Sequence, residues 1–190
     1  MNRPFNDQPI EILIDQNLLQ EGTILDLRLK YIGDQGMEYL SKCAKLINLR
    51  ELKLERNEIT DKGIQALAES TLLTSIKSLN LERNSIGDEG VRSISLSPIF
   101  SHLTALNLWK NQIGPEGAKA IADSLVLGSL QRLDLAENKI GDDGGKALVE
   151  SDALMSLKYV DLFGNGISQE TQRTIKESLN FKNLQHLVLE

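Results

Sequence analysis

The stretch LRELKLERNEITDKGIQAL (residues 49–67) decides how this chain folds, because its pattern returns at a fixed interval along the sequence. Isoleucine marks that interval of 27 residues at Ile32, Ile59, Ile86, Ile113, Ile140 and Ile167. A period of this length is typical of solenoids, in which each unit buries its apolar face only against its neighbours. The sequence therefore predicts a single row of stacked units.

Each unit begins with a predicted strand and continues into a predicted helix. Apolar residues two apart, as at Leu52 and Leu54, favour a short strand. Residues 63–69 have the spacing of a helix, and Asp61 just before them is the predicted N-cap. Asn57 falls where the chain must leave the strand, so its amide is expected to satisfy backbone groups of the turn. Glycines at 36, 63, 90, 117 and 144 are expected to let each helix approach its neighbour closely.

The pattern L-x-x-L-x-L-x-x-N-x-L in these units resembles the leucine-rich repeat. The long unit, with an I-G-D-x-G turn into its helix, resembles the cytosolic ribonuclease-inhibitor-like subfamily. The resemblance covers residues 22–190, as six repeats and a final partial repeat. It implies an α/β fold: a curved leucine-rich-repeat solenoid with a parallel concave β-sheet, convex helices and 27-residue repeats.

The two ends of the chain depart from the repeat. Residues 1–21 are predicted to form an N-terminal cap, because the isoleucines at 10, 12 and 14 alternate like an edge strand and Leu18 and Leu19 are placed to cover the first repeat. At the other end, either the last strand and Phe181 cover the final repeat, or the sequence is a piece of a longer chain. An uncovered strand edge there would be prone to pair with another chain.

Composition excludes several classes of partner and location. A net charge of -6 argues against nucleic acid, whose binding proteins carry basic patches. No stretch is long and apolar enough to span a bilayer, and the first residues lack the apolar core of a signal peptide. The single cysteine can form no internal disulfide. We therefore expect a monomer in the cytoplasm, or one delivered into a host cytoplasm if the protein is a bacterial effector.

The residues that could carry chemistry are explained by the repeat. Cys43 falls in a column of small residues, because steps of 27 lead from it to serines. Gly141–Lys146 superficially resembles a phosphate-binding loop, but the spacing between its glycines is one residue too short. Asp142 belongs to the N-cap column, and no cluster of ligands accompanies it and Asp143. We therefore predict no catalytic residue, no metal and no cofactor, and expect that the chain is not an enzyme.

Function is expected where the repeat leaves the residue type free. If Leu52 and Leu54 point inward, the residues that alternate with them point onto the concave face of the sheet. Aromatic residues are only 4% of the chain, yet the one tryptophan falls in these columns. The predicted protein-binding residues are Trp109, Phe163, Tyr159, Arg132, Asp134, Asp161, Glu82 and Glu55.

Trp109 and Phe163 are expected to lie two strands apart, about 10 Å, with the small Ala136 between them. A side chain of the partner could enter that gap, and aromatic and arginine anchors often dominate the energetics of interfaces. The other interpretation is that neighbouring strands stack these rings only to stabilise the sheet.

The predicted function is to bind a partner protein through the concave face, with inhibition or regulation of an enzyme as the expected consequence. The resemblance supports this expectation, since small cytosolic proteins of this kind often occlude an enzyme and bacterial effectors use similar modules. The alternative that the resemblance implies is a GTPase-activating protein of the leucine-rich-repeat type. The chain departs from that type because no repeat carries an inserted loop that could present a catalytic arginine or asparagine.

Overall fold

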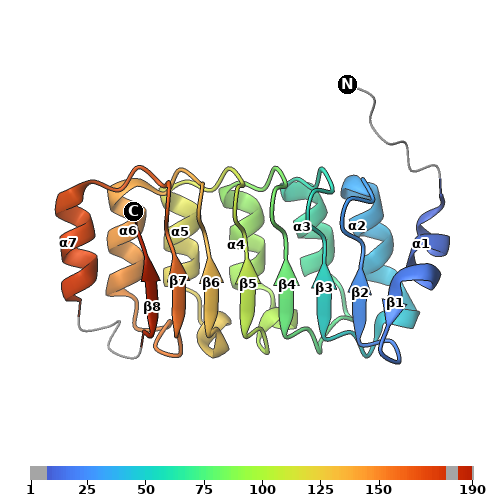
Figure 1. Cartoon of the computed structure of the whole chain (residues 1–190). Coiled ribbons are helices and arrows are strands. Elements are labelled where there is room, and N and C mark those ends of the chain that lie inside the picture. The colour runs from blue at the N-terminus through green and yellow to red at the C-terminus, as the bar shows by residue number, and fades with distance from the viewer. Residues whose placement is uncertain (1–7, 179–183, 190) are drawn as a thin grey trace, which may run out of the picture.

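The computed structural model describes residues 8–178 and 184–189, which form one row of strands with helices behind it (Figure 1). The strands are β1 (Leu18–Leu19), β2 (Ile24–Asp26), β3 (Glu51–Lys53), β4 (Ser78–Asn80), β5 (Ala105–Asn107), β6 (Arg132–Asp134), β7 (Tyr159–Asp161) and β8 (His186–Val188). The α-helices are α1 (Ile10–Asn17), α2 (Gly33–Lys42), α3 (Asp61–Ala68), α4 (Asp88–Leu96), α5 (Pro115–Ala122), α6 (Gly141–Glu150) and α7 (Gln169–Glu177). Short 3-10 turns lie at η1 (Ala44–Leu46), η2 (Pro98–Phe100) and η3 (Leu127–Ser129).

The strands follow one another in the sheet in chain order, and all neighbours from β2 to β8 are parallel. Each strand pairs with the next in the register of the sequence repeat, so that Leu52 lies beside Leu25 on one side and Leu79 on the other. This register confirms the predicted solenoid with its parallel sheet and 27-residue units.

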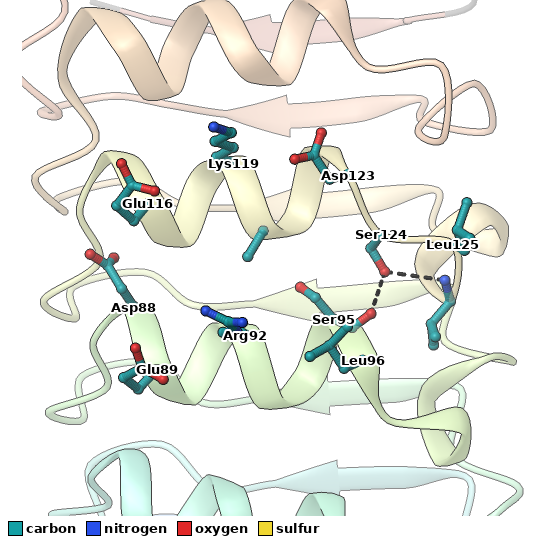
Figure 2. A pocket seen from close by; sticks show the side chains of 12 residues that line it. Asp88, Glu89, Arg92, Ser95, Leu96, Glu116, Lys119, Asp123, Ser124 and Leu125 are labelled. Carbon is teal, nitrogen blue, oxygen red and sulfur yellow. Dashed lines mark hydrogen bonds between the residues drawn. The ribbon is translucent and has the colours of Figure 1, made fainter.

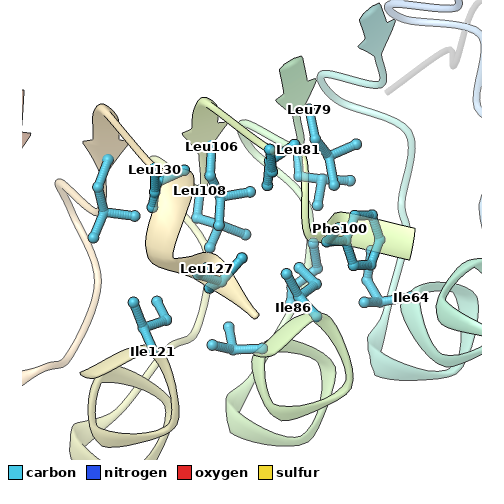
Figure 3. Close-up of a cluster of buried hydrophobic side chains, with 14 of the residues drawn as sticks. Ile64, Leu79, Leu81, Ile86, Phe100, Leu106, Leu108, Ile121, Leu127 and Leu130 are labelled. Atoms are coloured by element: carbon cyan, nitrogen blue, oxygen red, sulfur yellow. The ribbon is translucent and has the colours of Figure 1, made fainter. Parts of the chain in front are cut away.

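The apolar columns of the repeat fill the space between the sheet and the helices (Figure 3). Leu79 from a strand and Leu81 after it point inward, and Ile86 closes the unit from the turn before the helix. Phe100 enters the same layer from η2 and is fully buried. Burial of a side chain of this size contributes about 1.5–3 kcal/mol, so each unit depends on the apolar surface of its neighbours.

The asparagine column connects the turns of successive repeats. Asn111 is 8% exposed, and its Nδ2 donates to the carbonyls of Leu81 and Leu108, both at 3.0 Å. Its Oδ1 accepts the backbone N–H of Ile86 at 3.1 Å. The same pattern recurs at Asn57, Asn84, Asn138 and Asn165. The scaffold role predicted for this column is therefore confirmed.

The aspartate column has a different role from the predicted one. Asp61 is the first residue of α3 rather than its N-cap, and the side chain of Thr60 caps that helix instead. The Asp61 carboxylate accepts the N–H of Gly87 at 2.6 Å, and so reaches the start of the helix in the next repeat. A Cβ on Gly90 would lie 2.6 Å from the same carboxylate oxygen, so glycine is needed there for the predicted close approach. Asp142 acts in the same way on the N–H of Ser168.

The prediction of an edge strand over residues 10–14 is wrong, because this segment is the helix α1. Pro9 precedes the helix with a φ of -54°, which suits a helix start. Leu13 and Ile14 are buried and Ile10 packs against the core, which is the spacing of one helical face, whereas Ile12 is 44% exposed. The edge position is taken by β1, which pairs antiparallel with β2.

The column that begins at Cys43 forms a second ladder between repeats. In the later units a serine hydroxyl donates to a carbonyl near the end of the preceding helix, as Ser97 does to Ala68 at 2.5 Å and Ser124 to Ser95 at 2.7 Å. Cys43 is half-buried against the core at the head of this column. The geometry fits its predicted structural role.

The C-terminal end is described only in part. Strand β8 is the last in the sheet, and Leu189 after it is buried. Phe181 lies outside the described residues, so its predicted part in covering the last repeat stays a prediction. Within the described part of the chain, no helix is long and apolar enough to cross a membrane.

Replacing Asn111 by alanine is expected to lower the free energy of unfolding by about 2–3 kcal/mol, because it leaves buried backbone groups of two repeats without partners. Urea unfolding followed by circular dichroism measures the loss. Gln112→Ala, at the neighbouring exposed residue, is the control and should change stability by less than about 0.5 kcal/mol. Equal effects of the two substitutions would contradict the role given to the asparagine column.

Candidate protein-binding surface

The open face is the side of the sheet opposite the helices, and it corresponds to the predicted concave face. In β3 to β5 and in β7 the middle residue of each strand is buried while its two neighbours are half-buried, so side chains alternate as predicted. The chain then continues into what we call the exit row, the residues that follow the third open-face column: Arg56, Arg83, Lys110 and Glu137. Open-face and exit-row side chains together form the candidate surface.

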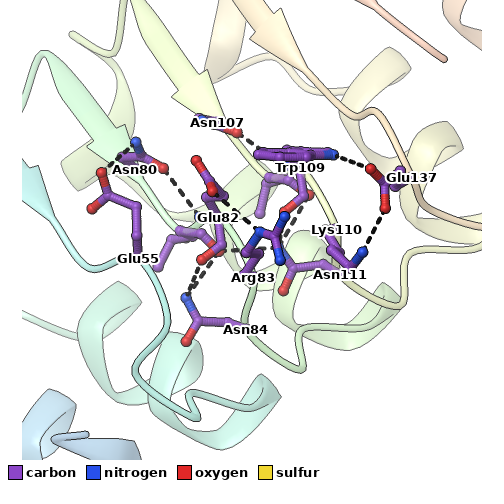
Figure 4. Close-up of polar contacts among 12 residues, drawn as sticks. Glu55, Asn80, Glu82, Arg83, Asn84, Asn107, Trp109, Lys110, Asn111 and Glu137 are labelled. Carbon is purple, nitrogen blue, oxygen red and sulfur yellow. Dashed lines mark hydrogen bonds and ion pairs between the residues drawn. The ribbon is translucent and has the colours of Figure 1, made fainter. Parts of the chain in front are cut away.

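Trp109 is held by two charged residues, one of which pairs with a third (Figure 4). The Arg83 guanidinium lies over the indole ring, with its Cζ 4.7 Å from the ring centroid. The indole Nε1 donates to Glu137 Oε1 at 3.1 Å, and Glu137 Oε2 pairs with Lys110 Nζ at 2.7 Å. The hydrogen bond from Lys110, and then that from Trp109, keep the pKa of Glu137 below its ordinary value. The ring is therefore positioned by the chain's own residues.

This arrangement contradicts the predicted gap between Trp109 and Phe163. Ala136 is only 6% exposed, so it does not form the floor of an open gap that a partner side chain could enter. The indole of Trp109 extends toward the next repeat and reaches Glu137, the neighbour of Ala136. The space beside Ala136 that the spacing of the strands predicts is therefore not open to a partner side chain.

The backbone of the exit row explains why its side chains reach across the sheet. The φ values of Arg83, Lys110 and Glu137 are 54°, 56° and 51°. They lie in the left-handed region, which residues other than glycine rarely adopt. The buried amides that follow them, such as that of Asn111, fix this turn. The same conformation recurs at Leu29, Arg56 and Gly164, so it belongs to the repeat and is not special to the aromatic clusters.

A second cluster surrounds Tyr159. The Arg132 guanidinium lies over the tyrosine ring, with its Cζ 3.9 Å from the centroid, and the Tyr159 hydroxyl donates to Asp161 Oδ2 at 3.2 Å. His186 approaches from the next strand, with ring centroids 6.3 Å apart. The structure thus brings three of the predicted residues, Arg132, Tyr159 and Asp161, into contact.

Phe163 differs from the other two rings. Its side chain is 49% exposed, and it has no ring or cation contact within the described residues. Its backbone N–H donates to Asp161 Oδ1 at 3.0 Å, and this bond fixes the backbone just after β7. Phe163 is therefore an exposed apolar side chain beside an ordered polar cluster.

The predicted carboxylates are distributed along the face. Glu55 Oε1 accepts a hydrogen bond from Asn80 at 2.8 Å, while its buried Oε2 has no hydrogen-bond partner in the described chain. Glu82 Oε1 lies 3.5 Å from Arg83 Nε, and Asp134 Oδ1 accepts the backbone N–H of Ala136 at 3.2 Å. Burial raises the pKa of Glu55 and that of Asp134, and Asp161 raises the second further. Both carboxylates would gain from a positive charge supplied by a partner.

Sequence reasoning missed the residues that position Trp109, which are Arg83, Lys110 and Glu137, and it missed Asn80, which bonds Glu55. The exit row was visible as a variable charged column, and it follows the aromatic column directly. What the sequence could not show is that the left-handed turn directs these side chains back over the sheet. Groups of His, Cys, Asp and Glu able to hold a metal ion are absent from the described residues.

Comparisons with known proteins place the repeat in a family. Residues 45–68, 73–95, 101–122 and 129–149 match the model described as "Leucine Rich repeat". A search of curated proteins finds no match. An internalin (inlF) from Listeria monocytogenes has a similar structure with a TM-score of 0.55 and 22% sequence identity, covering 76% of this chain and 36% of that one. The likeness concerns the fold.

The ectodomain of the receptor kinase SOBIR1 from Arabidopsis thaliana also contains leucine-rich repeats. It aligns with a TM-score of 0.37 and 18% identity, covering 77% of this chain and 63% of that one. This chain therefore spans less than two thirds of either structure.

Asp134→Asn is expected to stabilise the domain at pH 7 by a few tenths of a kcal/mol to about 1 kcal/mol, since water still screens the half-buried carboxylate. A carboxyl with a raised pKa in the fold adds stability while protonated and loses it as the pH rises through that pKa. The advantage of the variant should therefore vanish as the pH falls through the raised pKa toward 3.8.

Thermal unfolding of the wild type and the variant between pH 3 and pH 8 measures this difference. The control is Asp152→Asn, on an exposed loop, which is expected to show no such dependence. A variant that is less stable than the wild type at pH 7 would contradict the desolvation of Asp134.

Proposed function

Since the chain is a leucine-rich-repeat protein, we propose that it binds a partner protein through the open face, at the surface that carries Trp109, Tyr159 and Phe163. Leucine-rich repeats generally mediate protein–protein interaction, and stacked repeats present extended surfaces for it. The observation that carries the proposal is that two aromatic side chains on this face are held in place by neighbouring cations before any partner arrives.

Prior ordering of the rings favours binding energetically. Ordering a side chain at an interface costs about 0.5–1.5 kcal/mol, and a ring already fixed avoids most of this loss. Trp109 is fixed by a stacked guanidinium and by a hydrogen bond to its Nε1. Because that N–H is already used, Trp109 offers the partner apolar ring surface rather than a hydrogen-bond donor.

The same contacts also stabilise the sheet, so the interpretation as sheet packing has to be weighed against binding. Arg132 over Tyr159 would stabilise neighbouring strands whether or not a partner binds. Phe163 favours binding, because its exposed ring adds little to the sheet and lies next to the ordered cluster of Tyr159 and Asp161. Exposed aromatic side chains beside ordered polar groups are typical of binding surfaces.

The charges on this face indicate the chemistry of the partner. Glu55 and Asp134 are partly desolvated, and neither forms an ion pair within the described residues. A partner that presents lysine or arginine beside the aromatic rings would neutralise them. Charges at the rim of such a surface act mainly on the association rate and its dependence on salt.

The narrower functions stay proposals. Inhibition or regulation of an enzyme is the consequence we propose for occlusion of a partner's surface, in a cytosolic or effector-like setting. We also propose that the chain binds without catalysing a reaction of its own. The alternative function is activation of a GTPase. Among the described residues of the open face, no arrangement favours that function over simple binding.

The double variant Trp109→Ala, Phe163→Ala is expected to lose its partner in affinity capture from a lysate, because truncation of an interface anchor typically costs about 2 kcal/mol or more. The measurement is the recovery of one partner by the wild type and by each variant, quantified by mass spectrometry. Tyr39→Ala is the matched control, since Tyr39 is an exposed aromatic residue on α2, on the helix side of the chain. It should recover the partner fully.

Circular dichroism and thermal unfolding show whether the double variant keeps its fold. Equal recovery by a folded double variant and by the wild type would place the interface elsewhere. If the double variant unfolds, Phe163→Ala alone tests the same surface, because Phe163 is the more exposed ring.

Hydrolysis of GTP by small GTPases in the presence of the protein separates binding from GTPase activation. We expect the hydrolysis rate to stay unchanged, since the arginines nearest the aromatic rings, Arg83 and Arg132, stack on them. A rate increase that Arg83→Ala or Arg132→Ala abolishes would instead favour the activating function.

A further inference from the structure

A groove between α4 and α5 lies on the helix side of the chain, away from the open face (Figure 2). It has a volume of about 450 Å³. Leu96 and Leu125 line one end of it, and their side chains are 68% and 97% exposed. Two largely exposed leucines in one groove are unusual for a surface that contacts only water.

The repeat provides an internal comparison for these leucines. Leu96 falls in the column of Lys42, Glu69 and Glu150, and Leu125 in that of Thr71. The groove between α2 and α3 accordingly has Lys42 and Thr71 at the places that correspond to Leu96 and Leu125. The scaffold therefore accepts polar residues at both positions, and its stability does not require leucine at either.

The other end of the same groove is acidic. Glu89 and Glu116 stand in the first turns of α4 and α5, and neither forms an ion pair within the described part of the chain. Arg92 and Lys119 line the middle, but the lining as a whole holds more carboxylates than cations. Leu96 lies seven positions after Glu89 in α4, so the acidic and apolar ends are about 10 Å apart.

We propose that this groove is a second docking surface, which takes a short segment of a partner protein carrying a bulky apolar side chain and a basic side chain about 10 Å apart. The apolar side chain lies against Leu96 and Leu125, and the basic one lies between Glu89 and Glu116. An extended segment bridges that distance with three residues, and a helical one with seven.

The groove wall also contains a buried hydroxyl, on which the proposed docking does not depend. Ser95 lines the groove and is 2% exposed, yet its Oγ has no hydrogen-bond partner within the described residues. Buried hydroxyl groups are normally hydrogen-bonded. Its carbonyl is already used, since Ser124 donates to it at 2.7 Å.

The proposal is tested by selecting short random peptides displayed on phage against the whole chain. We expect the enriched peptides to share a bulky apolar residue and a lysine or arginine at one of the two spacings. Fluorescence polarisation of a synthesised peptide then gives its affinity for the wild type and for the variants.

The main variant is Leu96→Glu, Leu125→Asp, which introduces the residue types that other repeats have in these columns, Glu150 and Asp152. It should weaken peptide binding by about 30-fold or more, the loss expected when an interface anchor is removed. Glu89→Gln, Glu116→Gln should also weaken binding and reduce its dependence on salt. Trp109→Ala, Phe163→Ala should bind the peptide as the wild type does, because the open face is a separate surface.

Several outcomes would overturn the groove as a docking surface. One is a selection that enriches no peptide, and another is enrichment of acidic sequences. Equal binding by the wild type and a folded Leu96→Glu, Leu125→Asp variant would also overturn it. Peptides that lose affinity only through Trp109→Ala, Phe163→Ala bind the open face, and they would refute the groove while supporting the proposed function. If the double leucine variant unfolds, Leu125→Asp alone decides, since Leu125 is 97% exposed.

Discussion

The buried amide of the asparagine column is the interaction on which the rest of the structure depends. The strands β2 to β8 have only three residues each, so the chain must leave the sheet sharply at the end of each strand. The turn brings backbone N–H and C=O groups into a region without water, and a buried polar group without a partner costs about 1–3 kcal/mol. Asn111 supplies donors to two repeats and an acceptor to one of them. One side chain thus closes its own turn and joins it to the previous repeat.

Two further ladders use the same principle at the ends of the helices. Asp88 accepts the N–H of Gly114 at 2.6 Å, and Ser124 donates to the carbonyl of Ser95 at 2.7 Å. Successive repeats are therefore linked at the strand exit, at the helix start and at the helix end, except that Pro115 takes the place of the aspartate in one repeat. Polar bonds of this kind require a fixed geometry, so they set the register that the apolar layer alone would leave free to slide. The residues of the open face and of the outer surface of the helices do not take part in these three ladders, so the repeat does not fix their type.

The sequence predicted what its period repeats and failed where a feature occurs once or depends on the direction of a side chain. Leu52 and Asn57 were assigned correctly because several copies of each share one environment. Residues 10–14 have no second copy, and their isoleucines fit a strand as well as a helix until Pro9 and the burial of Leu13 are considered. The carboxylate of Asp61 acts on a residue 26 positions later, which local capping rules do not anticipate. The indole of Trp109 reaches Glu137 in the next repeat, and no periodic pattern encodes the direction of that side chain.

The two surfaces that the scaffold leaves free differ in how ordered they are, and this difference bears on binding. On the open face, Arg83 and Arg132 hold the rings of Trp109 and Tyr159, so a partner meets side chains whose freedom is already reduced. On the helix side, Leu96 and Leu125 project into water without such support. Binding there gains mainly from removal of apolar surface, at about 25 cal/mol per Å². The open face should therefore select its partner by geometry and charge, whereas the helix groove selects through one apolar contact and one distant charge.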